Sequence, residues 1–164
     1  MLPVAMLAGL VGLAAGAAAG VAFFVYSLRS KMIVATELPL KFEDAERRIV
    51  EKVPDVVPGW GMPIPELDFV AALAKRGHKA EGIRRAKIFF LCNPSYASRV
   101  VGAEARMIGM MPCHWALYET DAGQVFLSKL NIPMMSKMFG GPVGAAMKTV
   151  GRDEEQIIRA LTSS

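Results

Sequence analysis

The first 28 residues constrain this chain most, because they contain no Asp, Glu, Lys, Arg or His. The stretch from Leu2 to Leu28 reads LPVAMLAGLVGLAAGAAAGVAFFVYSL, and the first charged side chain after it is Arg29. As a helix it would reach about 40 Å, more than the roughly 30 Å hydrocarbon core of a membrane. We therefore predict a transmembrane anchor helix over residues 2–28 that crosses the inner (cytoplasmic) membrane once, with membrane lipid as a partner.

A cleaved signal peptide is the alternative, since the AAGAAAG run offers small residues near a cleavage site. No Lys or Arg precedes the apolar run, and the run exceeds the usual apolar core of a signal peptide, which favours an uncleaved anchor. Positive charge follows only on the carboxyl side, at Arg29 and Lys31. By the positive-inside rule we expect the following domain in the cytoplasm, with the periplasm as the alternative.

Small side chains recur along the anchor at every fourth residue. Ala8, Gly12, Gly16 and Gly20 fall on one face of a helix. Inside lipid, stripes of small residues let two helices approach closely, and close packing drives their association. The three glycines therefore predict a helix-packing contact with a second copy of the chain or with another subunit of a membrane complex.

The rest of the chain has the composition of an ordinary globular domain, because it carries all 19 Lys and Arg and all 15 Asp and Glu residues. We assign residues 29–41 to a linker and first strand, and residues 33–162 to a single α+β domain. Hydrophobic periodicity and turn residues predict its elements. These are a strand at 32–40, a helix at 42–53, a proline-rich loop at 54–65 around Trp60, a helix from Pro65 to Gly77 and a strand at 86–92.

The second half of the domain continues this pattern. Asn93 and Pro94 predict the start of a helix that runs towards Arg106. The segments CHWALYET and QVFLSKLN flank an Asp-Ala-Gly turn and predict a hairpin, and Asp153 is expected to cap a last helix. Strands and helices alternate only in part, so we predict an α+β fold with a largely antiparallel sheet and helices packed against it.

An ordered set of short motifs resembles a known family. Gly59-Trp60, CNP with Ala97 close behind, MPC, YE and a Gly-Gln-Val hairpin follow one another along the chain. In that order they resemble the bacterial family known as domain of unknown function number 302. The resemblance implies a TATA-binding-protein-like α+β domain, often a homodimer, and no established activity. The anchor, the methionine-rich tail and His114, where a basic residue such as Arg is expected, depart from the family pattern.

Cys92, Cys113 and His114 are the candidate metal ligands. If 113–120 is a strand, neighbouring side chains point to opposite faces, so Cys113 and His114 cannot form a nucleophilic pair. Cys113 then shares a face with Trp115 and Leu117 and is most simply a small buried side chain. The two cysteines lack the spacing of a zinc site, and we favour structural thiols over a functional pair.

Methionines are the second candidate. Met107, Met110 and Met111 precede Cys113, and Met147 lies further along. Their soft thioethers suit copper(I), although methionine more often fills irregular cores or adaptable docking surfaces. Trp60, Met134, Met135 and Met138 are the candidate ligand or partner surface.

Other function classes find less support. The stretch GGPVGAAMKT lacks the glycine that a phosphate loop needs before its lysine. The basic run from Lys75 to Lys87 lacks interleaved aromatic residues, so we expect a solvated face and no nucleic-acid partner.

We therefore favour a membrane-anchored, non-enzymatic binding or accessory module, acting as a homo-oligomer or a small subunit of a membrane complex. A metal or haem carrier with Cys, His and Met ligands, and a small enzyme with a pocket near Trp60 and the cysteines, are the alternatives. No cofactor is favoured, and the sequence leaves open whether the protein is an enzyme.

Overall fold

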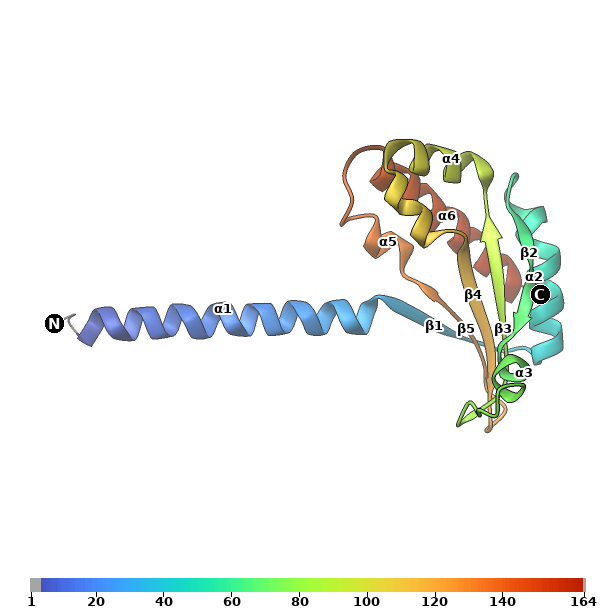
Figure 1. Cartoon of the computed structure of the whole chain (residues 1–164), viewed down its shortest axis with the longest axis horizontal. Helices are drawn as coiled ribbons and strands as arrows, with labels where there is room; N and C mark the ends of the chain where they lie inside the picture. The colour runs from blue at the N-terminus through green and yellow to red at the C-terminus, as the bar shows by residue number, and fades with distance from the viewer. Residues whose placement is uncertain (1–3, 164) are drawn as a thin grey trace. The chain divides into compact units, whose positions relative to one another are not determined.

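The computed structural model describes residues 4–163, without the side chains of residues 4–11 and 28. The chain divides into two compact units that meet between Ile33 and Val34. The first unit consists of helix α1 (Val4–Lys31) and the residues next to it. The second holds the sheet and all remaining helices (Figure 1).

Helix α1 is long and apolar enough to span a membrane, as the sequence predicts. Its segment Gly12–Lys31 has a mean hydropathy of 1.4, and none of the side chains described there is buried. By length and composition a signal sequence would also meet this description. A Cβ atom added at Gly12, Gly16 or Gly20 would meet nothing within 4 Å, so this face of the helix is open.

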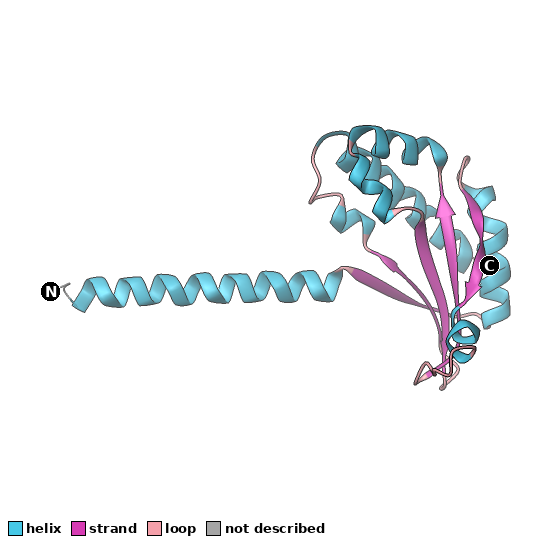
Figure 2. Cartoon of the chain, viewed as in Figure 1, coloured by secondary structure: helices cyan, strands magenta, loops and turns pink. Residues whose placement is uncertain are grey.

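A five-stranded sheet with the order β1-β5-β4-β3-β2 forms the centre of the second unit (Figure 2). The pairs β2–β3, β3–β4 and β4–β5 are antiparallel, in agreement with the predicted fold class. The strands are β1 (Ile33–Leu38), β2 (Gly61–Asp68), β3 (Ile83–Cys92), β4 (Cys113–Thr120) and β5 (Val125–Leu130). The helices are α2 (Phe42–Val56), α3 (Phe69–Ala74), α4 (Pro94–Ala103), the 3₁₀ helix η1 (Ala105–Met110), α5 (Ile132–Met135) and α6 (Gly141–Thr162).

The two faces of the sheet differ in burial because side chains alternate along each strand. On one face, Phe89, Trp115, Leu117 and Leu127 are buried and share a single core with the apolar sides of α2 and α6. We call this the covered face. The opposite face, which we call the open face, carries half-buried side chains such as Phe90, paired with His114 in the β3–β4 register.

Two predicted elements are wrong in their bounds. The proline-rich segment expected as a loop at 54–65 instead lets α2 continue through Pro54 and forms the first part of β2. The helix expected from Pro65 begins only at Phe69, where the Asp68 side chain caps it by accepting a hydrogen bond from the Ala71 amide. Proline is tolerated in β2 because this strand lies at the edge of the sheet, where one side needs no ladder donors.

The last helix is also longer than predicted. We expected Asp153 to cap it, but α6 begins at Gly141 with proline in its first turn. Asp153 lies inside the helix and accepts a hydrogen bond from the indole nitrogen of Trp60, with Nε1 and Oδ2 2.9 Å apart. Gly144, near the start of α6, serves packing, because a Cβ at this position would lie 2.1 Å from the Phe139 carbonyl oxygen.

Candidate functional site

An apolar pocket lies between η1, the start of β4 and α6. Asn93 ends β3 and caps α4, because its side chain accepts a hydrogen bond from the Ser95 amide at 3.1 Å. Glu104 then separates α4 from η1 and accepts from the Arg106 amide at 3.3 Å. These two caps turn the chain so that Met107, on η1, lies over the covered face of the sheet.

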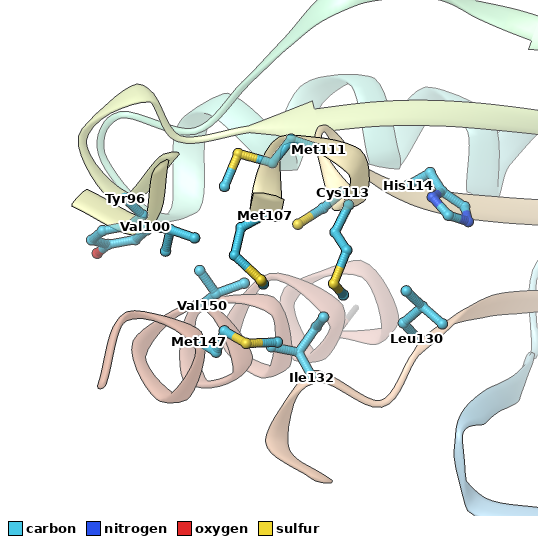
Figure 3. A pocket seen from close by; sticks show the side chains of 11 residues that line it. Tyr96, Val100, Met107, Met111, Cys113, His114, Leu130, Ile132, Met147 and Val150 are labelled. Atoms are coloured by element: carbon cyan, nitrogen blue, oxygen red, sulfur yellow. The ribbon is translucent and has the colours of Figure 1, made fainter. Parts of the chain in front are cut away.

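Five of the eleven side chains that line this pocket carry sulfur, and the pocket encloses a cavity of about 70 Å³. On the same measure of volume, about 10–15 Å³ is enough to hold one water molecule, so this cavity has room for a small ligand. We name it the sulfur pocket after the residues Met107, Met110, Met111, Cys113 and Met147. The apolar side chains of Val100, Leu130, Ile132 and Val150, together with Tyr96 and His114, complete the lining (Figure 3).

The Cys113 thiol stays protonated near neutral pH. Burial, with smaller contributions from the charge of Glu154 and from Cys92, raises the pKa of Cys113 to about 12. Only the thiolate is a strong nucleophile, so this thiol is inert in the unliganded pocket. Burial also raises the pKa of the Cys92 thiol. Both cysteines are free.

A buried ion pair lies beside the pocket. Glu154, whose side chain is 2% exposed, accepts a hydrogen bond from the Lys129 ammonium at 2.7 Å and one from the Trp115 indole at 3.0 Å. Together these contacts join α6 to β4 and β5. This pair was not predicted from the sequence, although a signal was present: Glu154 shares the helical spacing of Val150 and Ile157, which places it on the buried side of α6.

Of the three candidate metal ligands, Cys113 and His114 both line the sulfur pocket, whereas Cys92 does not. Leu91 pairs with Cys113 across β3 and β4, which places Cys113 on the covered face. Cys92 and His114 alternate to the open face, and Figure 3 shows the imidazole of His114 directed away from Cys113. Among residues 4–163, no group of three or more His, Cys, Asp and Glu side chains could hold a metal ion.

The predicted partner surface needs correction. Trp60 is 4% exposed and Met135 is 7% exposed, so both belong to the core. Trp60 also packs edge-on against Tyr96, with ring centroids 6.3 Å apart. Met138 is 61% exposed and Met134 is half-buried, and neither lines the sulfur pocket. The methionines that do converge are those around Cys113 and the more distant Met147.

The open face of the sheet is a second feature of interest. Its centre carries half-buried aromatic and aliphatic side chains, including Tyr118 and Phe126, whose rings stack at 5.2 Å. Ile64 pairs with Phe90 and is 45% exposed, so the apolar surface continues to the edge strand β2. An apolar patch of this kind on a sheet is typical of an interaction surface.

Comparisons with known proteins agree with this fold. The profile of the family described as domain of unknown function DUF302 matches residues 34–163. A solved structure titled "Crystal structure of uncharacterized conserved protein DUF302 from Bacillus stearothermophilus" resembles the chain with a TM-score of 0.68 and 15% sequence identity. The similarity covers 79% of this chain and 98% of that one and concerns the fold alone. No curated protein matches the chain. The family and the fold class predicted from the ordered motifs are confirmed.

Proposed function

Because the chain belongs to the DUF302 family through residues 34–163, and that description assigns no activity, we propose its function from the site itself. The protein is a membrane-anchored, non-enzymatic binding module that holds a small ligand in the sulfur pocket. The observation that carries this proposal is the cavity of about 70 Å³ left open among core side chains such as Val100, Met107 and Met147. Protein interiors are close-packed, so space kept open among apolar side chains favours a ligand site.

The chemistry of the lining supports binding over catalysis. Nucleophilic catalysis needs an activated group within hydrogen-bond reach of a base. Cys113 is held as a neutral thiol, and His114 points away from it. Burial, with help from the neighbouring Asp153 carboxylate, also raises the pKa of Tyr96. The pocket therefore offers contact surface and neutral donors, which suit retention of a ligand.

The membrane part of the proposal rests on α1. A helix with the hydropathy of Gly12–Lys31 suits a single crossing, and the positive charges Arg29 and Lys31 favour a cytoplasmic position for the domain. A reporter that fluoresces only in the cytoplasm, fused after Ser164, should then be bright, and a periplasmic reporter at the same place should be inactive. The reverse result would place the domain in the periplasm.

Self-association through the open face completes the proposal. The central residues of this face, such as Phe90 and Tyr118, are uncharged, so two copies can meet without like-charge repulsion. Ile64→Lys should break the assembly, because it puts a charge on a contact that would be desolvated. Val50→Lys is the matched control, since Val50 is 46% exposed on α2, away from this face. Equal oligomer size for both variants and wild type, by light scattering in detergent, would exclude the open face.

The pocket is tested with xenon, which enters apolar cavities. In full-length protein labelled at the methionine methyl carbons, xenon should shift the signals of Met107 and Met147 and leave that of Met138 in place. Val150→Phe should abolish the shifts by filling the cavity, whereas Val50→Phe on the exposed side of α2 should not. Absence of xenon-induced shifts in the wild type would overturn the pocket as the ligand site.

A further inference from the structure

The open space in the sulfur pocket is bordered mainly by one kind of heteroatom. Five of its lining side chains carry sulfur, namely Met107, Met110, Met111, Cys113 and Met147. Methionine that serves only as packing is flexible enough to fill irregular gaps. Here the thioethers instead surround a cavity of about 70 Å³ that stays open. Packing alone therefore does not account for the arrangement.

Three of these sulfur atoms come from different elements and enter the same space. Figure 3 shows Met107 reaching from η1 towards α6, Met147 standing on α6 beneath it, and Cys113 pointing inwards from the start of β4. Each element is held by its own contacts: Glu104 caps η1, Leu91 pairs with Cys113, and α6 is tied to the sheet through Glu154. A ligand set on such fixed elements is preorganised.

On the premise that this pocket is the protein's ligand site, we propose that it binds one Cu(I) ion through the Cys113 sulfur and the thioethers of Met107 and Met147. Thiolate and thioether sulfurs are soft ligands that select Cu(I) over magnesium, calcium and manganese, which prefer oxygen. No carboxylate lines the pocket. The nearby Glu154 uses Oε1 for Trp115 and Oε2 for Lys129.

Charge balance favours a monovalent ion. When Cu(I) binds, the Cys113 S–H bond breaks, its proton leaves to solvent, and the sulfur bonds to the metal. Cu(I) keeps its oxidation state and exchanges its ligands in solution for protein sulfurs. One positive charge and one thiolate leave the centre neutral, and burying a neutral centre avoids the cost of an unpaired charge. A divalent ion with the same three ligands would leave an uncompensated charge in an apolar pocket.

Competition with the chelator bicinchoninate measures the affinity for Cu(I), using the full chain in mild detergent without oxygen. Wild type should hold one ion, and Met107→Leu and Met147→Leu should each bind it at least about tenfold more weakly, a loss of about 1.4 kcal/mol. Leucine keeps the apolar volume of methionine and removes only the sulfur, so the fold tolerates it. Met138→Leu is the control, because this exposed thioether lies outside the pocket.

Silver(I), a redox-inert soft ion, provides a second readout on the same labelled methionine methyl signals. It should shift Met107 and Met147 and leave Met138 unchanged. Failure of wild type to retain Cu(I), or equal retention by wild type and both leucine variants, would overturn the metal site. If xenon still shifts the pocket signals in that case, the binding function stands with an apolar ligand. If xenon also has no effect, both proposals fail.

Discussion

The two ends of the covered face of the sheet differ in the side chains that pack there: charged residues gather at one end and apolar residues at the other. At one end, Arg85 donates to Glu119 at 2.7 Å and also bridges to Glu43 on α2, while its guanidinium lies 4.4 Å above the Phe42 ring. Nearby, Lys87 contacts Glu46 on the same helix. Most of these charged groups remain partly in water, with the Arg85 side chain 39% exposed.

The other end, around the sulfur pocket, is closed by apolar side chains with a single buried ion pair, Lys129–Glu154. Exposed ion pairs contribute little because water already solvates their charges, whereas a buried charge without its partner is costly. The partly exposed Lys87–Glu46 pair at the α2 end is therefore more easily replaced than the Lys129–Glu154 pair beside the pocket, although Glu119, the partner of Arg85, is itself buried. The ion pairs of Arg85 and Lys87 attach α2 to the sheet, whereas the other end of the covered face contains the open cavity of the sulfur pocket.

The largest effect should come from breaking the buried pair. Glu154→Gln leaves the Lys129 charge, 9% exposed, without a counter-charge and should lower the free energy of unfolding by about 3–5 kcal/mol. The measurement is urea unfolding of the full chain in mild detergent, followed by tryptophan fluorescence.

A double variant separates the missing charge from general damage to the core. Lys129→Met combined with Glu154→Gln removes both charges and keeps an acceptor for the Trp115 indole. It should be more stable than Glu154→Gln alone, because no buried charge is then left without a partner. A double variant no more stable than the single one would show that the pair is not the stabilising contact.

The next effect tests the thiol in the pocket. Cys113→Ser should lower the free energy of unfolding by about 1–3 kcal/mol, because a buried hydroxyl loses hydrogen bonds with water. Rapid modification of native Cys113 by a polar thiol reagent near neutral pH, at the rate of an exposed cysteine, would contradict its buried, protonated state.

The pH dependence of this group has a definite sign. The pKa of Cys113 in the folded state, about 12, exceeds the ordinary thiol value of 9.0. The folded state therefore keeps the proton longer than the unfolded chain, so the thiol's contribution is full below about pH 9 and is lost as pH rises towards 12. Wild type should lose more stability than Cys113→Ala over that range, and equal losses would show that Cys113 is not desolvated.

The sequence predicted this fold well where one local signal governed each element. The hairpin around Asp121-Ala122-Gly123 and the Asn93 cap are such cases, because turn and cap chemistry act over a few residues. Gly61–Asp68 was not recognised as a strand because its prolines suggested a loop, and only its position at the sheet edge makes them acceptable.

The candidate site was predictable only in part. Alternation along β4 correctly separated Cys113 from His114. Met147 could not be assigned to the same pocket, because it comes from α6, and no local pattern tells which face of the sheet a distant helix covers. The family profile matches residues 34–163 and so identifies the domain as a whole. It does not describe which side chains line the cavity.

A smaller effect is expected at the ionic end. Lys87→Met removes the contacts to Glu46 and Glu66, but the Lys87 side chain is 24% exposed and both carboxylates reach water. The free energy of unfolding should fall by less than about 1 kcal/mol, and the difference should shrink further in high salt. A loss as large as that of Glu154→Gln would remove the contrast between the two ends.

The smallest effect on the domain should come from the anchor, where a Cβ added at Gly12, Gly16 or Gly20 would meet no described atom within 4 Å. Gly16→Leu should leave urea unfolding of the domain unchanged, because α1 and the domain are separate compact units. It should also leave membrane insertion intact, since leucine is more apolar than glycine. Within lipid, however, helices associate through close backbone approach, which a leucine at the centre of the Gly12–Gly20 stripe prevents.

Anchor-mediated crosslinking should therefore be lost in Gly16→Leu and retained in Leu13→Ile, which changes side-chain shape outside the stripe. The comparison is best made with Ile64→Lys as a common background, so that association through the open face of the sheet does not hide the contribution of α1. Crosslinking of equal strength in both anchor variants would mean that the glycines reflect composition and that assembly depends on the domain alone. Loss of crosslinking in Gly16→Leu alone would show that α1 contributes to assembly independently of the open face of the sheet.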